Sequence, residues 1–186
     1  DGAEAVVPAD DSGIRSVEAR SVDKYVEDLL GHLREVHSSV QRTTLETIQK
    51  DESTMAGHVS QELQVGDPVP AFTLTDLDGK TWSNDDLLGS VYILQFTASW
   101  CGVCRKEMPH LEERVWQRFK EEGLTLLGVD LDEPVDKVRG LVEDTGVTYP
   151  ICLDPGGELF AAATVPTAGV TRNVVVDREG NIAFLT

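Results

Sequence analysis

Two cysteines separated by two residues, in "FTASWCGVCRKEMP" (residues 96–109), restrict the fold of this chain more than any other feature. They follow an apolar run typical of a buried strand and precede a charged run typical of a helix. Residues three apart on a helix share a face, so Cys101 and Cys104 are expected to lie together where a helix begins. The chain therefore has to turn from strand to helix at this point.

The helix start also predicts how the two sulfurs differ. In the first helical turn the backbone N–H groups lack intrahelical partners and the helix dipole is positive, so a thiolate at Cys101 is stabilised. Such cysteines have pKa values of roughly 3.5–7.5 instead of about 8.5. Arg105 and Lys106 add positive charge nearby. Cys104, one turn deeper, is placed to attack a mixed disulfide formed at Cys101.

Strand-like and helix-like segments alternate along the rest of the chain. A turn at Asp78-Gly79, after Phe72 and Leu74 and before Trp82, predicts a hairpin. Further strands are expected at Val91–Phe96, Leu124–Val129, Ile151–Leu153, Asn173–Val176 and Ile182–Leu185, and helices at Cys104–Glu121, Val135–Thr145 and Glu158–Ala163. This order predicts an α/β sandwich with parallel central strands and an antiparallel edge.

The first third of the chain differs from the rest in composition and in hydrophobic periodicity. Residues 1–20 are acidic and aperiodic, as in a flexible terminus, and residues 21–63 are expected to form a helical extension to a domain at 64–186. The extension carries one apolar stripe at helical spacing, made of Val22, Tyr25, Val26, Leu29, Leu33, Val36 and Val40. A helix with such a stripe needs a surface to cover.

Charge and hydropathy exclude some classes of partner. With 33 acidic and 16 basic side chains the net charge is −17, which disfavours nucleic acid and anionic membrane surfaces. No apolar run approaches the ~20 residues that a membrane span requires. The sequence begins at Asp1 without Met, which fits either a removed signal segment or a trimmed chain.

Several motifs together carry a family resemblance. "WCGVC" after an apolar strand, Pro109, "GDPVPAFTLTDLDGKTWS" upstream and "VVVDREGNI" downstream resemble the thioredoxin-like fold over about residues 65–185. More narrowly, they resemble the extracytoplasmic TlpA/ResA-type thiol-disulfide oxidoreductases of bacteria, in the AhpC/TSA-redoxin superfamily. The resemblance implies a three-layer sandwich with a mixed central sheet.

The resemblance also implies an activity and a setting. It implies thiol-disulfide exchange on protein thiols or disulfides, an upstream redox partner, no cofactor and no metal. The implied location is periplasmic, or membrane-anchored through a removed N-terminal segment. Neither the resemblance nor the Gly102-Val103 dipeptide reveals whether the protein reduces or oxidises, because direction depends on the reduction potential.

Individual roles follow from the same resemblance. Cys101 corresponds to the nucleophile and Cys104 to the resolving cysteine. Glu107 matches the glutamate of the "CxxCKxEFP" motif and lies one helical turn past Cys104, so it could relay the proton of Cys104 or simply be a solvated helix-face residue. Trp100 can form an apolar wall beside the attacking sulfur, Gly102 permits close approach of a substrate backbone, and Pro109 is expected to kink the helix five residues past Cys104.

The chain departs from the family at two positions. Gln95 stands where thioredoxin has a buried aspartate, and an amide cannot accept a proton at neutral pH. The family has a cis-proline six residues before the aspartate of "D-x-x-G", where this chain has Thr171. We expect Thr171 to replace that proline with a trans peptide bond, because a non-prolyl cis bond costs about 2.5–4 kcal/mol. Arg172 then faces either the active site or solvent.

Rival interpretations are weaker. A structural zinc site normally needs four ligands, and no second CxxC or CxxH unit is present. Cys152 is expected to be a small buried hydrophobe, the alternative being a third redox-active cysteine. A peroxiredoxin would need a threonine at Ala98, and a Sco-like copper module would need CxxxC with a later histidine. The acidic "DLDEP" run at residues 130–134 is expected to cap the next helix.

A last expectation concerns the uncovered sheet. Thioredoxin-like domains usually add a helix after the final strand, whereas this sequence stops at Thr186. A bare apolar sheet face is unfavourable in water. We therefore expect the helix at about Val22–Val40 to cover that face, the alternative being that the natural chain continues beyond this point.

Overall fold

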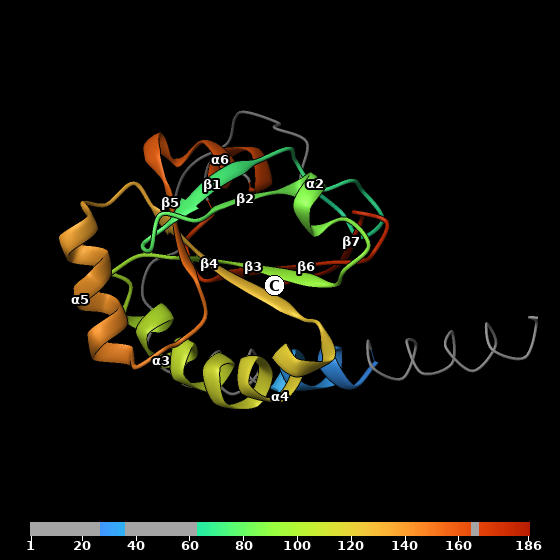
Figure 1. Ribbon diagram of the computed structural model, residues 1–186, viewed down its shortest axis with the longest axis horizontal. Coiled ribbons are helices and arrows are strands. Elements are labelled where there is room, and N and C mark those ends of the chain that lie inside the picture. The colour runs from blue at the N-terminus through green and yellow to red at the C-terminus, as the bar shows by residue number, and fades with distance from the viewer. Residues whose placement is uncertain (1–26, 36–62, 165–167) are drawn as a thin grey trace, which may run out of the picture.

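A computed structural model of the chain describes residues 27–35, 63–164 and 168–186, and its centre is a seven-stranded sheet (Figure 1). The spatial order is β2-β1-β5-β4-β3-β6-β7. The strands are β1 (Thr73–Asp76), β2 (Thr81–Ser83), β3 (Tyr92–Thr97), β4 (Thr125–Leu131), β5 (Ile151–Asp154), β6 (Arg172–Val176) and β7 (Ile182–Leu185). All lie within two residues of the expected positions.

The sheet is mixed. Strands β3, β4 and β5 are parallel neighbours, whereas β6 pairs antiparallel with β3 and with β7. The hairpin β1–β2 joins the opposite edge through antiparallel pairing of β1 with β5. The predicted α/β class, with parallel central strands and an antiparallel edge, is confirmed.

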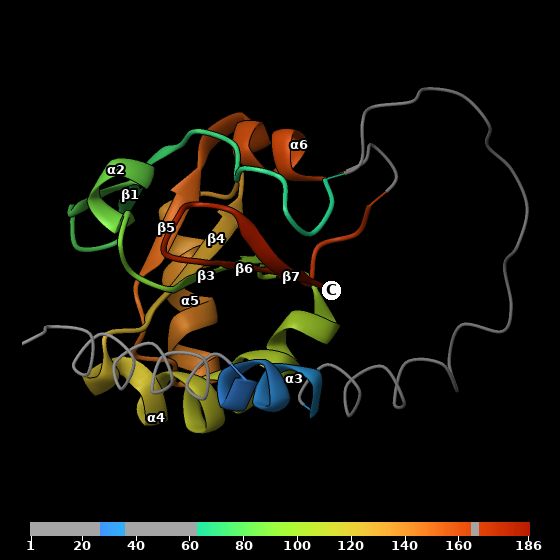
Figure 2. The same cartoon turned by 90° about the vertical axis from the view of Figure 1, so that its right-hand side faces the viewer.

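Helices cover both faces of this sheet (Figure 1, Figure 2). One face carries α3 (Gly102–Leu111), α4 (Gln117–Phe119), α5 (Val135–Thr145) and the helical residues 27–35, and the other carries α2 (Asn84–Leu87) and α6 (Glu158–Ala163). Burial of apolar side chains on both faces makes β3 buried at every position. Strand β3 is thus held from both sides.

The helix that carries the cysteines differs from the expected Cys104–Glu121. It begins at Gly102, continues as a π-helix at Glu112–Trp116, and ends through α4 and a 3-10 turn at Lys120–Glu122. Pro109 lies inside α3 and has no N–H to donate, so one bond of the helical ladder is missing just before the π segment. The short helix α2 was not predicted.

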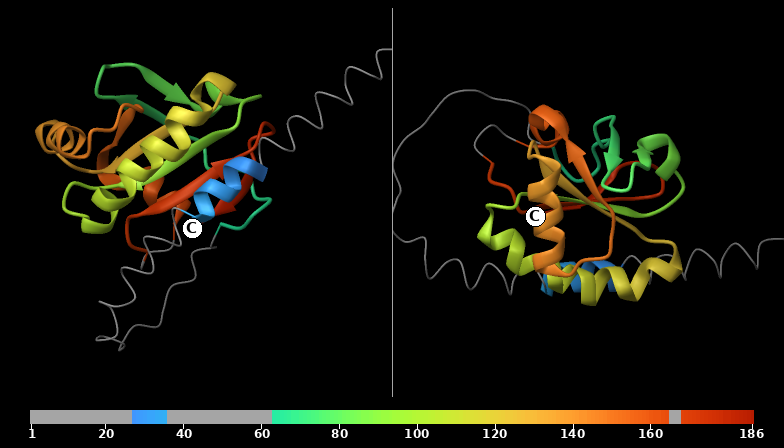
Figure 3. Two further views of the ribbon diagram at one scale, coloured as in Figure 1. Left: turned by 90° about the horizontal axis from the view of Figure 1, so that it is seen from below. Right: turned by 60° about the vertical axis from the view of Figure 1, so that its left-hand side comes forward.

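The helical residues 27–35 pack against the α3 face. Leu29 and Leu33 are buried with Phe119 and with Val175 of β6, and the Arg34 guanidinium lies 5.6 Å from the centre of the Phe184 ring of β7. Figure 3 shows this helix beside β6 and β7. Nine residues of the expected helix at about Val22–Val40 are therefore seen covering this part of the sheet, and the others lie outside the described residues.

Candidate active site

Cys101 and Cys104 form a disulfide at the junction between β3 and α3, with Cα atoms 5.3 Å apart. Cys101 is the N-cap residue of α3, one position before the helical turn where it was expected. Its Sγ accepts a hydrogen bond from the backbone N–H of Cys104 at 3.1 Å. One of the N–H groups at the helix start that would otherwise lack a partner therefore points at the Cys101 sulfur.

The surroundings distinguish the two sulfurs. Cys101 is 8% exposed and Cys104 is fully buried, and both pack with Ala98, Val103 and Val170. Trp100, directly before the pair, is 66% exposed. Gly102 is exposed and would leave its Cβ position in open space. An incoming disulfide can therefore approach Cys101 more easily than Cys104.

Thr171 lies opposite the disulfide and touches both of its sulfurs. Its Oγ1 is 3.1 Å from Sγ of Cys101 and 2.8 Å from Sγ of Cys104. Its N–H donates to the carbonyl of Phe96 at 3.2 Å, which ties this loop to the end of β3. No cis peptide bond occurs among the described residues. Arg172 follows as the first, partly buried residue of β6.

Glu107 is fully buried, so the solvated helix-face alternative is wrong. Its Oε1 accepts a hydrogen bond from Nδ2 of Asn173 at 2.9 Å. Burial raises the pKa of the Glu107 carboxyl, and the side-chain amides of Asn173 and Gln95 partly oppose that rise. Within the described part of the chain, Oε2 of Glu107 and Nε2 of Gln95 make no geometrically sound hydrogen bond. Burial therefore disfavours the charged form of this carboxyl.

Gln95 connects this carboxyl to a buried tyrosine. The Tyr149 hydroxyl donates to Oε1 of Gln95 at 2.7 Å, and Gln95 is paired with Asn173 across β3 and β6. Burial, followed by the charges of Glu107 and Glu112, raises the pKa of Tyr149 well above its ordinary value. The tyrosine therefore stays protonated and acts only as a donor here.

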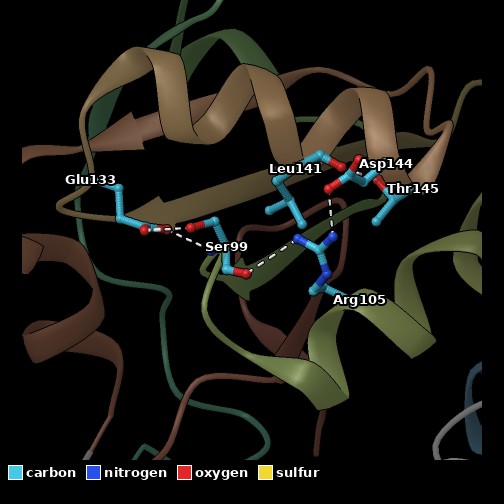
Figure 4. Close-up of polar contacts among 6 residues, drawn as sticks. All are labelled: Ser99, Arg105, Glu133, Leu141, Asp144 and Thr145. Atoms are coloured by element: carbon cyan, nitrogen blue, oxygen red, sulfur yellow. Dashed lines mark hydrogen bonds and ion pairs between the residues drawn. The ribbon is translucent and has the colours of Figure 1, made fainter.

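A second polar cluster holds the loop before the cysteines (Figure 4). The Glu133 carboxylate accepts hydrogen bonds from the Ser99 N–H at 2.5 Å and from the Ser99 hydroxyl at 2.6 Å. Arg105 donates to the Ser99 carbonyl at 3.3 Å and pairs with Asp144 of α5 at 2.5 Å. Both backbone polar groups of Ser99 are therefore fixed, and the Arg105 charge is shared with Asp144.

The acidic run before α5 has a different role from the expected helix cap. Pro134 is the N-cap of α5 and no side chain caps this helix. Instead Glu133 binds Ser99, and Asp130 is fully buried at the end of β4, where its Oδ1 accepts from the Glu133 N–H at 3.3 Å. Burial, followed by the neighbouring Glu133 charge, raises the pKa of Asp130 to about 7.

Comparison with known proteins decides the family. Residues 65–185 match the model of the AhpC/TSA family. The chain belongs to the AhpC/TSA family. It is 30% identical over 122 residues to the thiol-disulfide oxidoreductase ResA of Bacillus anthracis, a match that covers 66% of this chain and 69% of that protein. The ResA of Geobacillus kaustophilus is 32% identical over 118 residues, covering 63% and 66%.

Solved structures agree with these sequence relatives. A proposed protein disulfide isomerase from Bacteroides thetaiotaomicron is 50% identical, with a TM-score of 0.64 and coverage of 67% of this chain and 79% of that one. A proposed thiol:disulfide interchange protein DsbE from Chlorobium tepidum is 27% identical, with a TM-score of 0.60 and coverage of 67% and 85%. With the CxxC disulfide, these relatives identify this AhpC/TSA-family protein as a thioredoxin-like thiol-disulfide oxidoreductase.

Cys152 lies apart from the redox pair of this oxidoreductase. It is fully buried in β5, among the apolar side chains of the α6 face, and it is not disulfide-bonded. Burial, followed by the charge of Asp76, raises the pKa of Cys152 to about 12. A thiol in this state is a poor nucleophile.

Sequence reasoning missed several residues that contact the site. Asn173 and Tyr149 complete the surroundings of Glu107, and Glu133 binds Ser99. Asn173 had a weak signal, since it is a polar residue at the start of the apolar run "NVVV".

The described residues contain no group of three or more His, Cys, Asp or Glu side chains arranged for a metal ion, and no helix able to cross a membrane.

Proposed function

We propose that Cys101 is the attacking cysteine and Cys104 the resolving cysteine. Cys101 thiolate displaces one sulfur of a protein disulfide, which leaves as a thiolate, and a mixed disulfide forms at Cys101. Cys104 then attacks Cys101 Sγ, releases the second substrate thiolate and closes the internal disulfide. The observation that carries these roles is the hydrogen bond from the Cys104 N–H to Cys101 Sγ at the rim of the site, above a fully buried Cys104.

Glu107 is the proton acceptor for Cys104 in this proposal. Cys104 has to lose a proton before it can attack, and Glu107 lies one helical turn away, fully buried and with a raised pKa. Asn173 fixes the other carboxylate oxygen at 2.9 Å and so orients the group. Gln95 cannot substitute for Glu107, because an amide does not accept a proton at neutral pH.

The partners follow from the exposed rim. Trp100 offers an apolar surface beside Cys101, and Gly102 leaves room for a substrate backbone, so protein thiols and disulfides are the proposed substrates. An upstream redox partner would use the same surface to reset the pair. On its resemblance to the TlpA/ResA type we propose that the protein works outside the cytoplasm.

We also propose that the chain divides into a terminus at residues 1–20, a helical extension at 21–63 and the thioredoxin-like domain at 64–186.

The test is a trapping experiment with the reduced protein. Cys104→Ser should accumulate a mixed disulfide with a peptide disulfide, whereas Cys101→Ser should not, and Cys152→Ser serves as the cysteine control with wild-type behaviour. Trapping at Cys104 in the Cys101→Ser variant at the wild-type rate would contradict the assigned roles. Stopped-flow oxidation by hydrogen peroxide should be no faster than for an ordinary thiol, and a much faster reaction would instead support a peroxidase.

A further inference from the structure

The side chain of Thr171 is the one polar group seen in contact with both sulfurs of the described site. Its Oγ1 lies 3.1 Å from Sγ of Cys101 and 2.8 Å from Sγ of Cys104. A hydroxyl has one hydrogen to donate and can rotate about its C–O bond. From one position it can therefore donate to either sulfur.

The backbone of Thr171 adopts a conformation that its side chain disfavours. Its φ is +85°, in the left-handed region, where a β-branched residue is a genuine outlier. Such strain costs on the order of 1–3 kcal/mol and concentrates at functional sites. Glycine would adopt this φ without strain. The backbone alone therefore gives no reason for a threonine here, which leaves the side chain as the reason.

The loop that carries Thr171 is held beside the two cysteine sulfurs. The Thr171 N–H donates to the Phe96 carbonyl, Val170 packs on the cysteine pair, and Arg172 begins β6 beside Phe96. Contacts with β3 and β6 therefore hold Thr171 opposite the disulfide. The geometry places the hydroxyl at the sulfurs without any movement of the backbone.

We propose that Thr171 is a catalytic residue whose hydroxyl donates a hydrogen bond to whichever sulfur is negatively charged. This proposal rests on the proposed roles of Cys101 and Cys104. In the reduced protein the hydroxyl donates to the Cys101 thiolate. When Cys101 is in a mixed disulfide, the hydroxyl turns to Cys104 as that thiol gives its proton to Glu107. Thr171 itself neither gains nor loses a proton.

The charge of the acceptor makes this hydrogen bond stronger in the reduced state than in the disulfide state. A hydrogen bond to a thiolate is stronger than one to a neutral disulfide sulfur, because charge-assisted hydrogen bonds are roughly twice as strong as neutral ones. The hydroxyl therefore favours the reduced pair over the disulfide. Its removal should make the protein a stronger reductant and its Cys101 less reactive at neutral pH.

Three substitutions separate the hydroxyl from the shape of the residue. Thr171→Val keeps the branched side chain and the strain but loses the hydroxyl. Thr171→Gly loses both the hydroxyl and the strain, and Thr171→Ser keeps the hydroxyl. If the hydroxyl acts as proposed, serine should resemble the wild type and both valine and glycine should be impaired. A purely steric role would instead group valine with threonine.

Two quantities are measured. One is the rate of iodoacetamide alkylation of Cys101 at pH 7, and the other is the equilibrium constant for reduction of the Cys101–Cys104 disulfide by glutathione. Thr171→Val and Thr171→Gly should each lower both by about tenfold, the latter equal to about 30 mV towards a more reducing potential. Wild-type values in Thr171→Val, or impaired values in Thr171→Ser, would overturn the inference. Thermal melting checks folding, and Thr171→Gly covers the case in which valine does not fold.

The outcomes also distinguish this inference from the proposed function. If Cys101→Ser is inactive but Thr171→Val behaves as wild type, only the role of Thr171 fails. If Cys101→Ser retains thiol-disulfide exchange, the assignment of the cysteines fails first. The Cys152→Ser control shows that alkylation of the third cysteine does not contribute to the measured rate.

Discussion

The reactive pair and Cys152 occupy the same sheet, and they differ less in exposure than in hydrogen-bond donors. Cys101 is only 8% exposed, and Cys104 and Cys152 are fully buried. Cys101 Sγ, however, accepts from a helix N–H and lies against a hydroxyl, whereas Cys152 is surrounded by apolar side chains of the α6 face and has a pKa raised to about 12. Donors at the sulfur, and not solvent, therefore separate a reactive from an inert cysteine here.

The same contrast distinguishes the two faces of the sheet. Buried polar side chains gather on the α3 face near the pair, where Gln95, Glu107 and Asn173 lie, and several of their polar atoms have no partner within the part of the chain described. The face of α2 and α6 buries a mainly apolar cluster, in which the Tyr92 hydroxyl is a buried polar atom without a hydrogen-bond partner among the described residues. Unsatisfied buried groups are unfavourable for stability, so their presence beside the disulfide indicates a functional purpose.

The largest expected effect is the loss of activity in Cys101→Ser. Thiol-disulfide exchange with a protein disulfide should fall to background, by roughly 10³-fold or more, because Cys104 and Cys152 are both fully buried and less accessible to a substrate disulfide. Cys152→Ser should change the rate by less than about twofold. An insulin reduction assay measures both. Strong loss in Cys152→Ser would break the distinction between the two sites.

The packing of residues 27–35 should affect stability and leave the chemistry unchanged. Leu33→Ala removes a side chain that is 2% exposed and should lower the free energy of unfolding by about 2–5 kcal/mol. Denaturant titration measures this, with the exposed Glu35→Ala as the matched control. The glutathione equilibrium constant should stay at its wild-type value. A small effect of Leu33→Ala on unfolding would mean that this helix does not cover the sheet in solution.

Glu107→Gln should slow the release of substrate from the mixed disulfide by about 10–100-fold. Glutamine keeps the acceptor for Asn173 and removes only the ability to take a proton. In the wild type the rate of release should increase with pH as Glu107 ionises. Because burial raises the pKa of Glu107, this increase should occur at a higher pH than for an ordinary glutamate. Rapid-quench analysis of the mixed disulfide measures it. The exposed Glu113→Gln is the control, and an unchanged pH profile in Glu107→Gln would exclude the proton transfer.

Asp130 should make stability decrease with pH. The pKa of Asp130 in the folded protein is about 7, above its ordinary value of 3.8. Its contribution to the free energy of unfolding is therefore fully present below about pH 4 and is lost as pH rises through 7. Asp130→Asn should therefore stabilise the protein at pH 8 by up to about 4 kcal/mol and have little effect at pH 4. Denaturant titrations at both pH values test this. Equal effects at the two pH values would show that Asp130 does not titrate in this range.

The smallest effect is expected from the Ser99 contact. Glu133→Gln weakens two charge-assisted hydrogen bonds to Ser99 and should lower kcat/KM by about two- to tenfold, since the loop that positions Trp100 and Cys101 becomes less fixed. The exposed Glu143→Gln of α5 is the control. The glutathione equilibrium should change less than kcat/KM, and the reverse order would indicate a direct effect on the sulfurs.

Much of the fold could be predicted locally. Helices α5 and α6 and strand β7 have the expected bounds, because their apolar periodicity and turn residues agree with their tertiary surroundings. The start of α3 and the π-helical geometry of Glu112–Trp116 were missed, since the N-cap role of Cys101 and the π segment depend on local geometry more than on periodicity, whereas a kink at Pro109 was expected. The acidic run at 130–134 was misread because its side chains bind a loop distant in sequence.

The sequence by itself determined the CxxC pair, its place between strand and helix, and hence the class of chemistry, because those features depend on residues close together along the chain. Only the tertiary structure decided what surrounds the sulfurs. Thr171 reaches Cys101 across 70 positions and Asn173 reaches Glu107 across 66. Such contacts form when β6 pairs with β3, and the register of that pairing depends on the packing of the whole sheet.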